Sequence, residues 1–190
     1  MSFVQTTRAA EGLARRAFSV AEIERMQDLG IFRPDEKYEL LEGEIVPMQA
    51  KSPIHELIKE TLVRQLLRAL PDDLWLGVER TIFLSEHTAL DPDISLFRAN
   101  AKASKIDGPG LLLAIEVSHA SLAYDRGPKA RLYARHGVAD YWVIDAKRRR
   151  AFLHREPRAA GGWGAIVTLG PDEPLTHAAV PGFALKLADI

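Results

Sequence analysis

The sequence predicts an α+β protein with an α/β-like core, in which helices flank a mixed β-sheet and an N-terminal helix and hairpin come first. Apolar segments of strand length recur through the chain, and the central one spans 111–117. A strand, helix and strand follow one another over 111–145, which is typical of a crossover between parallel strands. Apolar residues on both sides of Glu42-Gly43 favour an antiparallel hairpin ahead of that core.

Composition excludes several classes of protein. The 190 residues are 47% hydrophobic and 27% charged, which is typical of a folded protein with an apolar core and not of an intrinsically disordered chain. The absence of cysteine excludes disulfides and thiolate metal sites and suits a reducing cytoplasm. We find no signal peptide and no run of the roughly 18 apolar residues that a membrane span needs, so we expect a soluble, cytoplasmic protein. With 25 Lys and Arg against 26 Asp and Glu, any binding to nucleic acid should be weak and salt-sensitive.

We expect a flexible N-terminal arm, 1–17, followed by a single domain, 18–190. The arm shows little pattern. Its arginines, Arg8, Arg15 and Arg16, could touch a phosphate backbone, but solvated terminal charge is the simpler interpretation.

Two helices and a hairpin are expected in the first part of the domain. A capping box predicts the first helix over 19–30. The hairpin covers 38–48, and its Glu42 and Glu44 are expected to face solvent. The second helix covers 53–70, and its predicted buried stripe is Ile54, Leu57, Ile58, Leu62, Leu66 and Leu70.

The strands of the core are expected over 74–84, 90–97, 111–117 and 141–145. Because Pro92 has no N–H group, the strand over 90–97 should lie at a sheet edge or begin there. Strand 111–117 is continuously apolar apart from one glutamate, which indicates a central position in the sheet.

A third helix is expected to begin near Ser121 or Asp125 and to end at His136. Pro128 is tolerated only in the first turn of a helix, so the regular part should begin just before it. A hairpin over 151–169 closes the domain.

Two carboxylates and a lysine point to a chemistry. Asp93 and Glu116 stand on neighbouring predicted strands that could converge at one sheet end, and Lys129 follows on the third helix. Carboxylates hold hard divalent cations such as Mg²⁺ or Mn²⁺. The cation polarises a phosphate and activates a bound water, while an ammonium group orients that water or offsets charge on the phosphorus oxygens. The pattern favours metal-dependent phosphodiester hydrolysis.

Glu116 is the most informative single residue, because a glutamate at the end of a buried strand is costly unless it is paired or bound to metal. The alternative role for it is a buried salt bridge to an arginine. His55, alone on the second helix, is by itself more often structural or solvated than catalytic.

Several strings of residues are long enough to be specific. They are P-D-I-S-L, I-E-V-S and D-R-G-P-K-A-R-L-Y-A-R-H-G-V-A-D-Y-W-V-I-D in the second half, and Y-E-L-L-E-G-E-I-V and S-P-I-H in the first. Through them the chain resembles the Uma-type putative restriction endonucleases, of the PD-(D/E)XK nuclease superfamily, over roughly 18–190. The superfamily pattern has a lysine two residues after its acid, but Ser118 occupies that position here. The family's segment E-V-L-S-P-S-T reads E-V-S-H-A-S-L, so the detail of that loop differs.

The resemblance implies a restriction-endonuclease-like sheet with a Mg²⁺ or Mn²⁺ site formed by Asp93, Glu116 and the backbone carbonyl of Val117. It implies Lys129 as the displaced lysine and Glu39 as a further catalytic acid. Supporting roles fall to three other residues: His55, Asp125 and Tyr133. The implied substrate is DNA, cut by a homodimer, because two strands need two sites related by a two-fold axis.

Two other functions fit the same residues. The chain could be a nuclease fold without activity that binds a nucleic acid or a protein, which the near-neutral charge favours. It could also hydrolyse a smaller phosphoester with the same acids. Metal titration separates the first from a nuclease, and comparison of an oligonucleotide with a chromogenic phosphodiester separates the second.

Overall fold

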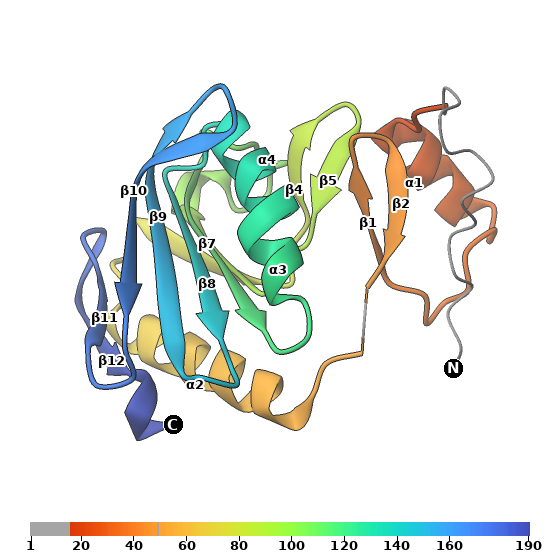
Figure 1. The fold of residues 1–190 in the computed structure, drawn as a ribbon. Coiled ribbons are helices and arrows are strands. Elements are labelled where there is room, and N and C mark those ends of the chain that lie inside the picture. The colour runs from red at the N-terminus through yellow and green to blue at the C-terminus, as the bar shows by residue number, and fades with distance from the viewer. Residues whose placement is uncertain (1–15, 49) are drawn as a thin grey trace.

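The structure is a computed structural model that describes residues 16–48 and 50–190 (Figure 1). It is the expected mixed α+β structure, in which three sheets are flanked by a few helices. Most of the expected flexible arm, with Arg8 and Arg15, lies outside the described residues, whereas Arg16 forms an ion pair with the first turn of the first helix. In the described part of the chain, no helix is long and apolar enough to cross a membrane.

The largest sheet has six strands in the order β10-β9-β8-β7-β6-β3. From one edge to the other they are β10 (Gly162–Leu169), β9 (Arg150–Arg158), β8 (Asp140–Asp145), β7 (Leu111–Ser118), β6 (Ile94–Arg98) and β3 (Leu74–Val78). β7 and β8 are parallel, and every other neighbouring pair is antiparallel. The mixed sheet, the parallel crossover and the closing hairpin of β9 and β10 are therefore confirmed.

Each face of the six-stranded sheet has its own apolar core. Helix α2 (Pro53–Ala69) covers one face, together with the hairpin of β11 (Pro174–His177) and β12 (Val180–Lys186). The other face packs against the helix that links β7 to β8, whose buried Tyr133 lies on Tyr141 of β8. Figure 1 shows α2 running beneath the sheet, away from that linking helix.

A second sheet of four strands lies beside the N-terminal helix, in the order β2-β1-β5-β4. Its strands are β1 (Tyr38–Leu41), β2 (Glu44–Pro47), β4 (Ile82–Ser85) and β5 (Thr88–Leu90). The predicted hairpin is confirmed, with its turn at Gly43 (φ 85°) and with Glu42 and Glu44 exposed. Helix α1 (Val20–Asp28) begins at the predicted capping box, in which Ser19 and Glu22 bond to each other's backbone N–H groups.

Two of the predicted strands are each divided between the two sheets. The segment 74–84 forms β3 and β4, and the chain changes direction at Glu79, whose φ of 48° lies in the left-handed region. The segment 90–97 leaves β5 at once and enters β6 only after Pro92 and Asp93. The prediction of continuous strands was wrong because apolar alternation persists across both breaks. The expectation that a strand begins at Pro92, because a proline cannot donate to a sheet ladder, is confirmed by the start of β6 at Ile94, although β6 is not an edge strand.

The third helix begins at Leu122 with Ser121 as its N-cap, which confirms the earlier of the two predicted starts. It consists of α3 (Leu122–Tyr124), a π-helical turn (Asp125–Lys129) and α4 (Ala130–Arg135) in direct succession. The regular helix was predicted to begin next to Pro128, but that proline lies inside the π-helical turn. A proline ring collides with the carbonyl four residues earlier in an α-helix, and the wider π-helical turn relieves that collision.

The buried face of α2 also differs from the predicted stripe. Leu62 and Leu66 are buried as predicted, but Leu57 is 48% exposed. In its place the helix buries two polar residues, His55 and Lys59. Their side chains contact Asp93 and Glu79, so the first turns of α2 combine charge pairing with the apolar packing of Ile58.

Candidate active site

A cavity of about 460 Å³ opens where the end of the six-stranded sheet, the first turn of α2 and the π-helical turn meet. Its lining includes the following charged or titratable side chains: Glu39, Lys51, His55, Asp93, Glu116, Asp125 and Lys129. They come from five segments that are far apart in the sequence. The structure therefore brings together all the acids and the lysine that the sequence assigns to a site.

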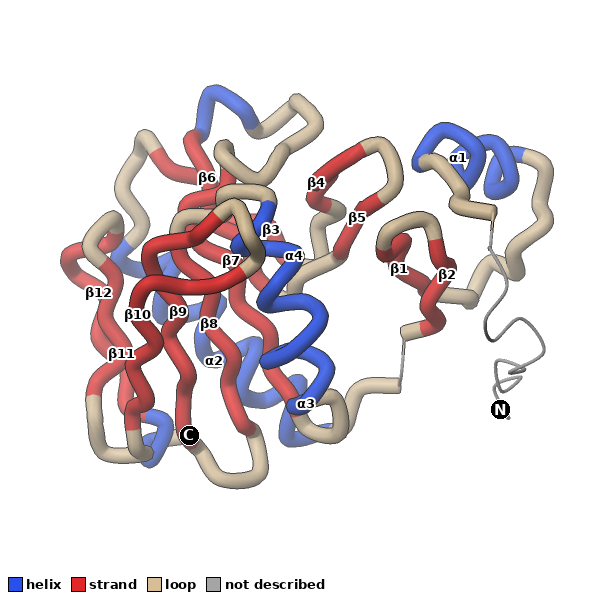
Figure 2. The backbone as a smooth tube through the Cα atoms, turned by 45° about the horizontal axis from the view of Figure 1, so that its top comes forward, coloured by secondary structure: helices blue, strands red, loops and turns tan. Residues whose placement is uncertain are grey.

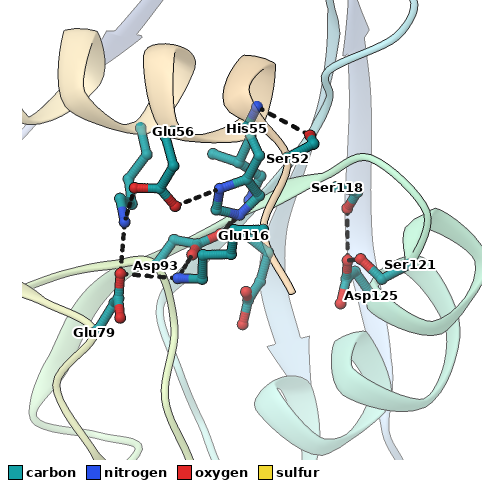
Figure 3. Close-up of polar contacts among 12 residues, drawn as sticks. Ser52, His55, Glu56, Glu79, Asp93, Glu116, Ser118, Ser121 and Asp125 are labelled. Carbon is teal, nitrogen blue, oxygen red and sulfur yellow. Dashed lines mark hydrogen bonds and ion pairs between the residues drawn. The ribbon is translucent and has the colours of Figure 1, made fainter. Parts of the chain in front are cut away.

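Asp93 lies at the junction of the two sheets, just ahead of β6, and is 4% exposed. Its Oδ2 accepts a hydrogen bond from the backbone N–H of Val117 at 2.8 Å. The same oxygen lies 2.9 Å from His55 Nε2 (Figure 3). Its Oδ1 lies 2.7 Å from Lys51 Nζ. Burial alone would raise the pKa of Asp93, but the hydrogen bond from His55 and the charge of Lys51 hold it below its ordinary value. Asp93 is therefore an ionised carboxylate at neutral pH.

Glu116 lies on β7, the strand paired with β6, and its side chain points into the same cavity. Lys129 Nζ lies 2.9 Å from Glu116 Oε1 and 2.8 Å from Glu39 Oε1, so it bridges the two glutamates. Tyr133 donates a hydrogen bond to Glu116 at 3.4 Å, and the backbone N–H of Asp91 donates one to Glu39 at 3.0 Å. The buried salt bridge considered for Glu116 thus exists, but with a lysine and not with an arginine.

The site carries more acid than base. Burial raises the pKa of Glu116 well above its ordinary value, and the charges of Asp93 and Asp125 raise it further. Burial also raises the pKa of Glu39. Burial would lower the pKa of Lys129, but the two glutamates raise it well above the usual range, so the ammonium persists. Four carboxyl groups face two ammonium groups in the cavity lining, which favours the binding of a further cation.

Hydrogen bonds to Asp125 hold the π-helical turn against the sheet. The hydroxyl groups of Ser118 and Ser121 donate to its Oδ2 at 2.6 and 2.5 Å (Figure 3). Tyr141 donates to its backbone carbonyl at 3.0 Å. Asp125 begins the turn that Lys129 ends, so these bonds determine where the lysine lies. Ser118, through its hydrogen bond to Asp125, therefore helps to position Lys129.

The family model Uma2, described as "Putative restriction endonuclease", matches residues 20–188. The chain belongs to this family. The fold is also similar to a crystal structure described as that of a putative nuclease belonging to DUF820, from Anabaena variabilis ATCC 29413. The two chains share 19% sequence identity with a TM-score of 0.68, and the match covers 85% of this chain and 93% of the other. Among curated proteins, no match is found. The chain therefore belongs to the Uma2 family and shares the fold of that crystal structure.

Lys51 is the part of the Uma2 site that the sequence did not reveal. It contacts Asp93 and also lies 2.9 Å from Oε1 of Glu79. Glu79 in turn lies 2.5 Å from Lys59 and 2.9 Å from Lys37, and these three lysines hold its pKa below the ordinary value despite burial. The only signal in the sequence was that Lys51 immediately precedes the S-P-I-H string, and a lysine in a loop has no periodicity to indicate its direction.

The donors in the Uma2 cavity fit a divalent metal ion by type but not by their present arrangement. The buried carboxylates of Glu39, Asp93 and Glu116 are the hard oxygen ligands that Mg²⁺ and Mn²⁺ prefer. In the part of the chain that the structure describes, however, no three His, Cys, Asp or Glu side chains lie close enough to hold an ion together. The ammonium groups of Lys51 and Lys129 lie 2.7 to 2.9 Å from these carboxylates. An ion in this cavity would therefore compete with these ammonium groups for the same carboxylate oxygens.

Proposed function

We propose that this Uma2 protein is a Mg²⁺- or Mn²⁺-dependent endonuclease that hydrolyses phosphodiester bonds in DNA. The observation that most supports this function is the convergence of three buried side chains, Asp93, Glu116 and Lys129, in one cavity. The two acids come from the ends of paired strands, and the lysine lies 2.9 Å from the second acid. Metal-assisted hydrolysis of a phosphodiester needs this combination of carboxylates and a nearby cation.

The residues that would hold the ion are Asp93, Glu116 and the backbone carbonyl of Val117, with Glu39 as a further carboxylate. Bound there, the ion would polarise the phosphate and lower the pKa of a bound water. The excess of acid over base in the cavity supports such a site, because buried carboxylates without a full set of partners are costly.

The two lysines have different proposed roles. Lys129 keeps its proton, because its pKa is raised well above the usual range, so it acts as a hydrogen-bond donor and a charge and not as a general base. It would orient the attacking water or offset negative charge on the phosphorus oxygens. Lys51 is proposed to neutralise Asp93 until an ion binds and then to shift toward Glu79, which it already contacts.

We propose that the basic turn Lys147–Arg150 contacts the DNA backbone. Ser118 of β7 lies opposite Asp145 of β8, so the turn after β8 emerges at the same sheet end as the candidate site. Figure 2 shows the turn from β8 to β9 and the loop from β7 to α3 at the same edge of the molecule. Lys147 and Arg148 are exposed there, although Asp145 offsets part of the charge. Because the net charge of the chain is −1, this binding to DNA should be weak. Because it depends on contacts between basic side chains and phosphates, it should also be salt-sensitive.

The proposal is tested by Mn²⁺ calorimetry on the wild type and on Glu116→Gln, with plasmid nicking in parallel. Glutamine keeps the size of the side chain and removes the charge that would bind the ion. We expect the variant to lose both Mn²⁺ affinity and nicking. Glu86→Gln is the matched control, because Glu86 is exposed in the hairpin turn between β4 and β5 and should retain both.

The other outcomes separate the alternatives. Mn²⁺ binding without nicking, combined with cleavage of a chromogenic phosphodiester, would favour a hydrolase of smaller phosphoesters. No Mn²⁺ binding at millimolar concentration would reject the metal site and favour a non-catalytic binding module. Unchanged nicking by Glu116→Gln would reject the assignment of the acid.

A further inference from the structure

The outer face of α2 carries an unusual pattern of exposed residues. Leu57 and Leu67 are 48% and 53% exposed, although large apolar side chains in this helix would be expected to face the sheet. Between them lie Glu60 and Arg64, both exposed. Residues at these spacings share one face of a helix, so the four side chains form a single stripe on the side turned away from the sheet. This stripe, with Arg68 at its end, forms the outer face of α2.

Charge and apolar character on this face are symmetric about Leu62. Glu60 lies two residues before it and Arg64 two residues after it, while Leu57 and Leu67 lie five residues before and after. An antiparallel copy of the helix, placed by a two-fold axis at Leu62, would therefore bring each glutamate to an arginine and each leucine to a leucine. Such self-complementarity is what an isologous interface requires.

We infer that the outer face of α2 is the interface of a homodimer, in which α2 packs antiparallel on the same helix of a second copy. The principal pairs are Glu60 with Arg64 of the other copy, and Leu57 with Leu67. Among the described residues, Glu60 and Arg64 make no ion pair within the chain, so both charges are available to the second copy.

A groove beside the helix extends this interface. It has a volume of about 580 Å³ and is lined by side chains of α2, such as Val63 and Leu67, and by Val78 at the end of β3. Val78 is 45% exposed, and β3 is the edge strand of the six-stranded sheet. The helix alone is about 25 Å long, and a standard interface buries about 800 Å² on each partner. The groove is therefore needed to reach that size, and we expect a dissociation constant on the order of 1–10 μM.

The inference does not rest on the proposed nuclease activity, because it follows from the surface of α2 alone. Such a dimer would contain two copies of the candidate site. His55 lies seven residues from the two-fold axis, so the two cavities would be separated by about 21 Å along the direction of the helices.

Sedimentation equilibrium on charge-reversed variants tests the inference. The wild type should have the mass of two chains of 21.1 kDa at tens of micromolar protein. Glu60→Arg places two arginine pairs across the two-fold axis, and Arg64→Glu places two glutamate pairs there. In each variant, repulsion between like charges should raise the dissociation constant of the dimer at least about 10-fold. An equimolar mixture of the two variants restores opposite charges at every pair and should form a heterodimer. The double variant Glu60→Arg/Arg64→Glu should likewise recover the dimer.

Two controls make the result decisive. Asp172→Arg reverses an exposed charge far from α2 in the sequence and should leave the mass of the dimer unchanged. Recovery in the mixture shows that neither single variant is misfolded. A wild type that is monomeric at 100 μM, or a dimer that neither variant weakens, would overturn the inference. Weakening by both variants without recovery in the mixture would also overturn it, and would favour a different protein as the occupant of this face.

Discussion

Replacement of Lys129 with methionine would test whether the buried charges of the site form one coupled unit. Methionine keeps much of the length of the lysine side chain and removes its charge. The change leaves Glu39 and Glu116, which are 4% and 6% exposed, side by side without the ammonium group between them. Removal of one partner from a buried ion pair costs about 3–5 kcal/mol. For a domain of this size, that loss lowers the melting temperature by about 6–20 °C.

The loss should depend on pH in a definite direction. Burial raises the folded-state pKa of Glu116 above its ordinary value of 4.5, and loss of the Lys129 charge raises it further. A carboxyl group with a raised pKa binds its proton more tightly in the folded state, so its contribution to stability is present below the unfolded pKa. That contribution is lost as pH rises through the folded pKa. The difference between the wild type and the variant should therefore be smaller near pH 5 than near pH 8.

Thermal unfolding followed by circular dichroism at the two pH values measures both effects. The double variant Lys129→Met/Glu116→Gln is the informative comparison, because it removes the charge of both partners and leaves one buried carboxylate fewer. It should recover most of the lost stability. Equal melting temperatures for Lys129→Met and the wild type at pH 8 would refute the reasoning, as would a double variant less stable than Lys129→Met.

Three further changes have predictable outcomes. Lys147→Ala and Arg148→Ala should each lower the slope of log K against log salt for DNA binding by about 1, measured by fluorescence anisotropy, and an unchanged slope would exclude this turn from the interface. Lys51→Met removes an ammonium group that competes for a carboxylate oxygen, so calorimetry should show Mn²⁺ binding about 10-fold tighter, whereas weaker binding would contradict the competition. Gly43→Ala places a Cβ against the chain ahead of α1 at a φ of 85°, so the melting curve should report a loss of about 1–3 kcal/mol, and an unchanged curve would show that the hairpin does not need glycine there.

The core of the fold was predictable because its signals are local and agree with one another. β7 and β8 are continuous apolar runs separated by a helix of suitable length, and their parallel pairing follows from that order. The capping box at Ser19 marked the beginning of α1, and the turn at Gly43 marked the first hairpin. In each case one short stretch of sequence contains both the element and its boundary.

The candidate site was predictable in its residues but not in its contacts. The family strings identified Asp93, Glu116 and Lys129, all of which line one cavity. They did not indicate that Lys51 contacts Asp93, or that Glu79 gathers three lysines, because both sets of contacts join segments distant in the sequence. Such pairs depend on how two sheets and a helix meet, which no local pattern encodes.

The elements whose boundaries were predicted wrongly border the same cavity or the lysines beside it. The break at Glu79 turns its carboxylate toward Lys51, and just after the break at Pro92 the side chain of Asp93 accepts a hydrogen bond from the backbone N–H of Val117. The π-helical turn carries Lys129 to its two glutamates. Local rules describe regular structure, and departures from them persist where surrounding contacts stabilise them, often at functional sites. Two of these departures border the cavity itself and the third lies beside its Lys51, which supports the cavity as the candidate site independently of the family strings.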